Sequence, residues 1–221
     1  HQVISTKKQE RRSLEESLRK EILNIETKFI CDEVELNEVC DINPEPFRKQ
    51  AFSPIRYIDI GCVKHECIND VHEMYEDYPS RAKRIVRQHD ILFSTVRPNL
   101  NGYAMLYSPI DNGVASSGFA VIRSKATCEL SAKYIYTLLK RAAVTEYLMM
   151  HATGTKYPTV NPNVFKTIKL IIPRDRHHLE SLEPFITRIY ALESEIQEAT
   201  VAYDNKLMAL YNDTQSIHLE N

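Results

Sequence analysis

An apolar heptad repeat over residues 182–210 restricts the fold of this chain more than any other feature. The repeat, called the seam below, consists of Leu182, Ile189, Ile196, Tyr203 and Leu210, with Phe185, Leu192 and Ala199 three positions after the first three. Apolar residues at this spacing form one stripe on a helix that packs lengthwise against another helix. Burying each Leu or Ile is worth about 1.5–3 kcal/mol. The seam therefore needs a partner, either within this chain or in another subunit.

A second amphipathic helix is predicted near the start of the sequence. No Pro or Gly occurs from Thr6 to about Phe29, and one apolar stripe consists of Leu14, Leu18, Ile22, Ile25 and Phe29. Gaps of three and four residues place these side chains on one helical face, with Lys, Arg and Glu on the others. We expect this helix and the seam helix to contribute to a coiled-coil stalk.

The segment between these helices has a different composition and residue pattern. It contains all five glycines and every proline except Pro184. Short β-rich runs bounded by turn residues occur at 56–60, 90–96, 104–107, 119–123 and 169–172, and helical spacing recurs at 132–150. The sequence thus predicts an α+β fold. A mixed, β-rich globular domain at 32–175 is flanked by amphipathic helices at 1–31 and 176–221.

Charge is distributed unevenly in this domain, although the formal net charge is only -2. Residues 66–77 hold five acids and no Lys or Arg, whereas residues 81–97 hold five bases and one acid, Asp90. The bases are Arg81, Lys83, Arg84, Arg87 and Arg97. One interpretation is a solvated face. The other is contact with the phosphates of double-stranded DNA, which provide most of the affinity of DNA-binding proteins.

Side chains suited to contacting bases follow the basic segment. Arg can donate to guanine and Asn to adenine. The DNA-binding candidates therefore also include Asn99, Asn101, Thr155, Lys156 and Tyr157. For Arg97, a structural or phosphate-binding role is favoured over base recognition.

Catalytic, cofactor and metal motifs were sought and not found in this sequence. It lacks the motifs of hydrolases, nucleotide-binding loops and amino-methylases. Cys62, His65 and Cys67 lack the second ligand pair of a zinc site, and His177-His178 is interpreted as a surface feature. The five cysteines form no disulfide pattern and favour a reducing cytoplasm. No apolar run is long enough for a membrane span. We expect no catalytic residue, cofactor or metal.

Several segments of the domain resemble one protein family in order and spacing. The stretch 81–100, RAKRIVRQHDILFSTVRPNL, is similar to the signature of recognition domains in type I restriction-modification specificity subunits. The segments YIDIGCV, GVASSGFAVI, ATGTKYP and IKLIIP resemble further parts of that pattern. His89 departs from it, because the family usually has Gly there. We therefore expect a turn that requires positive φ to be replaced or distorted.

The resemblance implies a non-catalytic subunit that recognises one half of a bipartite DNA target. It also implies helices that dock DNA methyltransferase subunits, with a restriction or translocase subunit as a further partner. The family carries two recognition domains and this sequence has one. We therefore expect either a half-subunit that forms a homodimer or part of a longer protein that contains a second domain.

Two other hypotheses remain open from the sequence. The chain could be a helical adaptor whose globular head binds protein partners. A weaker alternative is a nuclease or methylase with an unrecognised site. Salt-dependent binding to duplex DNA distinguishes the first hypothesis from DNA recognition.

Overall fold

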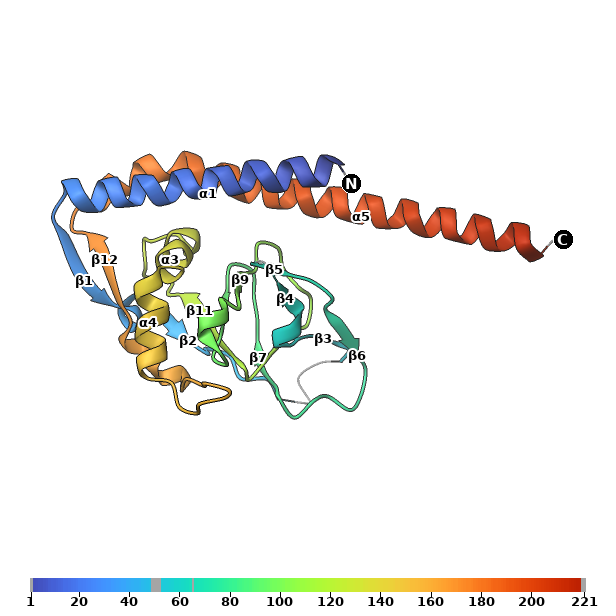
Figure 1. Ribbon diagram of the computed structural model, residues 1–221, viewed down its shortest axis with the longest axis horizontal. Coiled ribbons are helices and arrows are strands. Elements are labelled where there is room, and N and C mark those ends of the chain that lie inside the picture. Colours follow the sequence, from blue (N-terminus) through green and yellow to red (C-terminus); the bar gives the residue numbers. More distant parts are fainter. Residues whose placement is uncertain (1, 49–52, 65, 220–221) are drawn as a thin grey trace. The chain divides into compact units, whose positions relative to one another are not determined.

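The computed structural model describes residues 2–48, 53–64 and 66–219, with side chains as far as residue 209. The chain forms a helical unit, from residues up to 29 and from 175 onward, and a globular unit at 30–174. Long helices and several sheets occur together, which confirms the predicted α+β class. Figure 1 labels the elements of both units.

The helices are α1 (Gln2–Lys28), α2 (Leu36–Val39), α3 (Ala132–Leu139), α4 (Ala142–Met150) and α5 (Glu183–Leu219). The 3-10 turns are η1 (Ile60–Cys62), η2 (Pro98–Leu100), η3 (Pro162–Thr167) and η4 (Arg176–Leu182). The strands are β1 (Cys31–Glu35), β2 (Cys40–Ile42), β3 (Ile55–Ile58), β4 (Val63–Lys64), β5 (Cys67–Ile68), β6 (His72–Met74), β7 (Ala82–Ile85), β8 (Ile91–Ser94), β9 (Tyr103–Met105), β10 (Gly113–Ser116), β11 (Phe119–Ser124) and β12 (Lys169–Pro173).

In the helical unit, α1 lies antiparallel along the first half of α5 (Figure 1). The buried apolar side chains between them are Leu18, Ile22 and Ile25 of α1, Leu182 of η4, and Ile186, Ile189, Leu192 and Ile196 of α5. Ion pairs run along the two helices. Arg188 binds Glu10 at 2.8 Å, and Arg11 and Lys7 pair with Glu193 and Glu195. This chain thus supplies a partner for the first part of the seam.

The stripe on α5 differs in detail from the predicted seam. Ile186 is buried, whereas its neighbour Phe185 is half-buried, because the buried face of a packed helix includes positions four residues apart as well as three. Further along, α5 continues past the start of α1 (Figure 1), and Tyr203 is 41% exposed. The side chain of Leu210 lies outside the described residues. At the other end of the pair, Phe29 follows α1 and stacks on His178 with ring centroids 3.5 Å apart.

Two four-stranded sheets form the body of the globular unit. One has the order β6-β3-β10-β7, with β3 and β10 parallel, and the other is antiparallel with the order β2-β11-β8-β9. A separate ribbon of β1 and β12 pairs Cys31 with Pro173, which brings the two ends of the unit together. Strand β7 was not predicted from the sequence, because its charged residues suggested a solvated segment.

The second sheet is buried on both faces, which explains why β8 is an apolar run without alternation. Leu92 joins a core cluster with Ile58, Ala115, Phe119 and Val121 from both sheets. Its neighbour Phe93 points the other way. There it packs on Tyr103 and Phe165, with ring centroids 5.1 and 5.4 Å away. This buried sheet holds the loops at its strand ends in fixed positions.

The predicted helical segment at 132–150 consists of two helices rather than one. Arg141 adopts an extended backbone conformation and its carbonyl accepts a bond from Val144, so a new helix begins there. Ser131 caps the first helix by accepting a bond from the Tyr134 N–H. Within the described part of the chain, no helix combines the length and hydrophobicity needed to cross a bilayer.

Candidate nucleic-acid interface

The basic segment begins on β7, which lies between β10 and the segment 45–47. Lys83 accepts a backbone bond from Phe47, and Ile85 donates one to Glu45. Because Ala82 is buried in the core, Arg81 and Lys83 on either side of it are exposed. Both side chains are accessible to a phosphate. Arg84 is half-buried, and desolvation lowers the pKa of its guanidinium.

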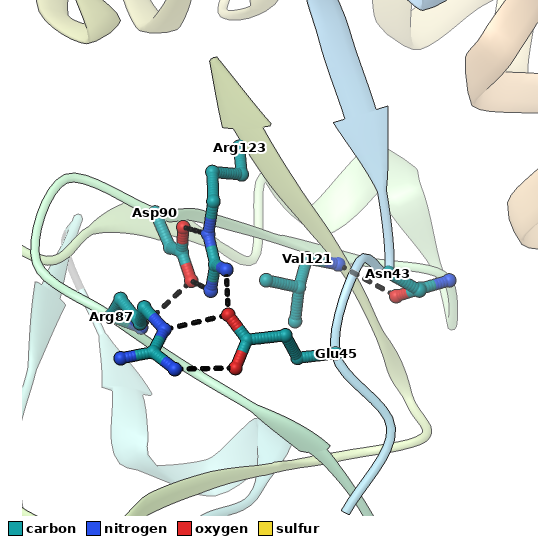
Figure 2. A network of polar contacts seen from close by, with 6 residues as sticks. All are labelled: Asn43, Glu45, Arg87, Asp90, Val121 and Arg123. Atoms are coloured by element: carbon teal, nitrogen blue, oxygen red, sulfur yellow. Dashed lines mark hydrogen bonds and ion pairs between the residues drawn. The ribbon is translucent and has the colours of Figure 1, made fainter. Parts of the chain in front are cut away.

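Arg87, whose side chain is 64% exposed, belongs to an ion-pair network within the domain, shown in Figure 2. Its guanidinium donates two bonds to Glu45, at 2.6 and 2.7 Å. Arg123 also pairs with Glu45 and donates two bonds of 2.7 Å to Asp90, a residue with no exposed surface. The Arg87 backbone N–H donates to the same carboxylate at 2.8 Å. Phosphate contact, which the sequence predicted for Arg87, would compete with this network.

The network fixes the segment around Glu45 against β8 and β11. Hydrogen bonds from Arg87, then from Arg123, lower the pKa of Glu45 to about 2. The hydrogen bonds from Arg123 to Asp90 raise the pKa of the Arg123 guanidinium. Asn43 adds a bond of 3.0 Å from the Val121 N–H (Figure 2). One feature of the sequence indicated these contacts. Asp90 immediately precedes the apolar run of β8, and a buried carboxylate requires a partner.

His89 keeps the turn that the sequence analysis expected to be replaced or distorted. Its φ is 69°, in the left-handed region that glycine adopts most readily. The His89 N–H donates to Leu106 at 2.7 Å, and the Leu106 N–H donates back to Asp90 at 2.9 Å. These two bonds hold the conformation without glycine, so the expectation was wrong.

The second group of predicted residues gathers where β8 ends. The Arg97 N–H donates to the Pro158 carbonyl at 2.7 Å, and an isolated bridge pairs Val96 with Thr159. The Arg97 guanidinium lies 4.2 Å from the centre of the Tyr157 ring and donates to the Lys156 carbonyl at 3.4 Å. The structure therefore joins residues about sixty positions apart in one cation–π stack.

The surface around this stack is largely exposed. Asn99, Asn101, Thr155 and Lys156 are all exposed. Leu100 and Tyr157 are large apolar residues with exposed fractions of 65% and 56%. The basic strand and this surface flank the same turn between β10 and β11. Ser117 donates to the Arg81 carbonyl at 2.7 Å, and Thr95 donates to the Gly118 carbonyl at 2.8 Å. We call Arg97, Asn99, Leu100, Asn101, Thr155, Lys156 and Tyr157 the recognition surface.

One group of potential metal ligands occurs among the described residues. Atoms of Asp59, Cys62 and His72 lie within 4.8 Å of one another. They already bond internally, since the Cys62 thiol donates to Asp59 and the Asp70 carbonyl, and burial raises the pKa of that thiol. His65, considered in the sequence analysis, lies outside the described residues. His177 bonds to Glu180 at 2.7 Å.

Comparison with known proteins identifies the family. The family model described as type I restriction modification DNA specificity domain matches residues 31–200. The HindI specificity subunit of Haemophilus influenzae is 31% identical over 145 residues, which is 64% of this chain and 31% of that protein. The chain thus spans about a third of this curated relative.

Solved structures show the same fold. The HsdS subunit from Thermoanaerobacter tengcongensis matches with a TM-score of 0.58 and 24% identity, covering 80% of this chain and 47% of that one. A chain from a structure of type I restriction-modification complex assembly has a TM-score of 0.58 and 26% identity, covering 82% and 50%. The family match extends over most of the chain and includes every residue of the recognition surface. The chain therefore belongs to the type I restriction-modification DNA specificity domain family.

Proposed function

We propose that this chain binds double-stranded DNA through its globular unit and recognises one half of a bipartite target within a type I restriction-modification complex. The observation that carries the proposal is the recognition surface, where Arg97 is stacked on Tyr157 inside the segment matched by the family. In this role the chain needs no catalytic residue or cofactor. Methylation and cleavage belong to partner subunits, and the place of action is the cytoplasm.

Two sets of cations would contact the DNA backbone. Arg81 lies just before β7 and Lys83 on it, and Arg97 and Lys156 lie on the recognition surface. We place Arg97 on a phosphate, because Tyr157 and the Lys156 carbonyl orient its guanidinium. Arg87 has a structural role in this proposal, since its Nε and one Nη both donate to Glu45. Arg84 contributes chiefly to the fold.

Fluorescence anisotropy of the full chain on labelled duplexes at several salt concentrations tests this proposal. Removal of one phosphate contact reduces the slope of log affinity against log salt by about 0.9. We expect that loss for Arg97→Ala. The control is Lys169→Ala, a cation on β12 that pairs with Glu33 and is 58% exposed. Equal slopes for both variants, or no duplex binding at low salt, would contradict the proposal and favour a protein-binding adaptor.

The helical unit is proposed as the assembly element. Beyond the part of α5 that packs on α1, Tyr203 and Leu207 form a stripe four positions apart on one helix face and are 41% and 55% exposed, whereas Val201 and Met208 lie on another face. Apolar residues at this spacing suit helix–helix packing. We propose that this stripe contacts methyltransferase subunits or a second recognition domain, the latter from a homodimer or from a longer protein, since the chain spans about half of the solved relatives.

Light scattering of the chain, alone and mixed with its methyltransferase subunit, tests the assembly role. Tyr203→Lys with Leu207→Lys should abolish association, because two charges enter the same apolar stripe. Asn205→Lys changes an exposed polar residue of the same helix and serves as the matched control. Unchanged mass for the double variant, with wild-type complexes still present, would refute the role of this stripe.

A further inference from the structure

Leu100 is a solvent-exposed apolar side chain on the recognition surface. It is 65% exposed, and the side chains on both sides of it in the sequence, Asn99 and Asn101, are exposed as well. The nearby cation–π pair of Arg97 and Tyr157 lies at the start of the same turn. Leu100 and Tyr157 thus give this surface two large, exposed apolar side chains beside amides and a cation.

The backbone of this triplet is held firmly. Pro98 is buried at the start of η2, and the N–H groups of Leu100 and Asn101 donate to Arg97 and Pro98 at 2.9 and 3.1 Å. Arg97 and Asn101 both have positive φ, 49° and 54°, so the turn is bracketed by two left-handed residues that are not glycine. Such conformations cost free energy and cluster at functional sites. The turn therefore presents the triplet in a fixed conformation.

We propose that Asn99, Leu100 and Asn101 recognise A·T base pairs in the major groove, with Leu100 against the 5-methyl group of a thymine. This inference rests on the proposed DNA-binding function. The thymine methyl is the apolar group that a base presents in the major groove, so it is the contact that a leucine can make there. An asparagine amide matches the N6 and N7 edge of adenine, the partner of thymine. The cations next to the triplet would contact the phosphates.

The experiment begins with the assembled specificity complex and duplexes selected from a random pool, which define its target. Each thymine of the selected duplex is then replaced by uracil, which lacks only the methyl group, and affinity is measured by anisotropy. At one position the replacement should weaken binding about fourfold, which is the change in affinity expected when one buried methyl-sized group is lost. Leu100→Ala should weaken binding to the thymine duplex and remove the difference between thymine and uracil.

Two controls make the outcome specific. Ile171→Ala removes an apolar side chain on β12 that is 38% exposed, and should leave the thymine preference intact. Asn99→Ala and Asn101→Ala are tested on duplexes with 7-deazaadenine, which lacks N7, and at least one of them should abolish sensitivity to that change. Both asparagine variants retain Leu100, so they should retain the methyl effect.

The possible failures are separable. Sequence-specific binding whose thymine preference survives Leu100→Ala overturns the inference and leaves the proposed function intact. A rise in 2-aminopurine fluorescence that depends on Leu100 also overturns it, because it would show that the leucine separates stacked bases. Absence of any salt-dependent duplex binding refutes the proposed function, and this inference with it.

Discussion

Replacing Glu45 by glutamine removes the charge at the centre of the network in Figure 2 while keeping the size of the side chain. In the folded protein this carboxylate accepts two bonds from Arg87 and pairs with Arg123. The variant leaves Arg87 with a neutral acceptor, whereas Arg123 keeps the carboxylate of Asp90. The segment that carries Glu45, which also pairs with β7 through the Ile85 N–H, should therefore bind less firmly to the globular unit.

The pKa of Glu45 sets the size of the effect. Hydrogen bonds from Arg87 and Arg123 lower it from 4.5 to about 2. A carboxylate whose pKa is lowered by folding stabilises the fold at pH values above its pKa in the unfolded chain. This contribution is lost as pH falls from about 4.5 through about 2. The full pKa shift corresponds to about 3 kcal/mol of folding free energy at pH 7. Because the side chain is 28% exposed, solvent screening reduces the expected loss to about 2 kcal/mol.

Urea unfolding of the wild type and Glu45→Gln at pH 7 and pH 3 measures this contribution. The difference in free energy of unfolding should be about 2 kcal/mol at pH 7 and about half of that at pH 3, because the protonated carboxyl resembles the amide. Glu33→Gln is the control, since Glu33 is 53% exposed and pairs only at the surface with Lys169. It should cost less than about 1 kcal/mol. A Glu45→Gln effect that is equal at both pH values would refute the electrostatic argument.

Two further predictions concern the helical unit and the recognition surface. Ile189→Lys places a charge at a site with no exposed surface between α1 and α5 and should cost about 3 kcal/mol or more in thermal unfolding, whereas Leu207→Lys, at a side chain 55% exposed, should leave the melting temperature unchanged. Tyr157→Ala removes the ring under Arg97 and should weaken DNA binding about two- to fivefold, and Tyr157→Phe should not, because the cation–π contact uses only the ring face. A Phe variant as weak as the Ala variant would indicate a role for the hydroxyl instead.

Part of this architecture was predictable because its signals are local. The seam indicated the long helix α5, and apolar runs indicated strands such as β8, β11 and β12. Periodicity of three to four residues or of two is carried by neighbours in the chain, so it survives without tertiary information. The order of segments from 81 to 173 also indicated the family before any contact was known.

The site was predictable in composition but not in arrangement. Arg87 and Arg97 look equivalent in the sequence, as two bases in one segment. Tertiary contacts separate them, because Arg87 meets Glu45, 42 positions away, and Arg97 meets the Lys156 carbonyl, 59 positions away. Neither partner is visible in a local pattern, since hydrogen bonds between distant segments depend on how the strands pair.

The sequence by itself determined a β-rich domain between two amphipathic helices and a family of DNA specificity domains. Only the tertiary structure decided that Arg87 pairs with Glu45 and that Arg97 stacks on Tyr157. It also decided that Leu100 is solvent-exposed, although a leucine after a proline gives no sign of this in the sequence. The physical reason is that helix and strand periods are local properties, whereas burial and ion pairing are set by the packing of segments distant in the chain.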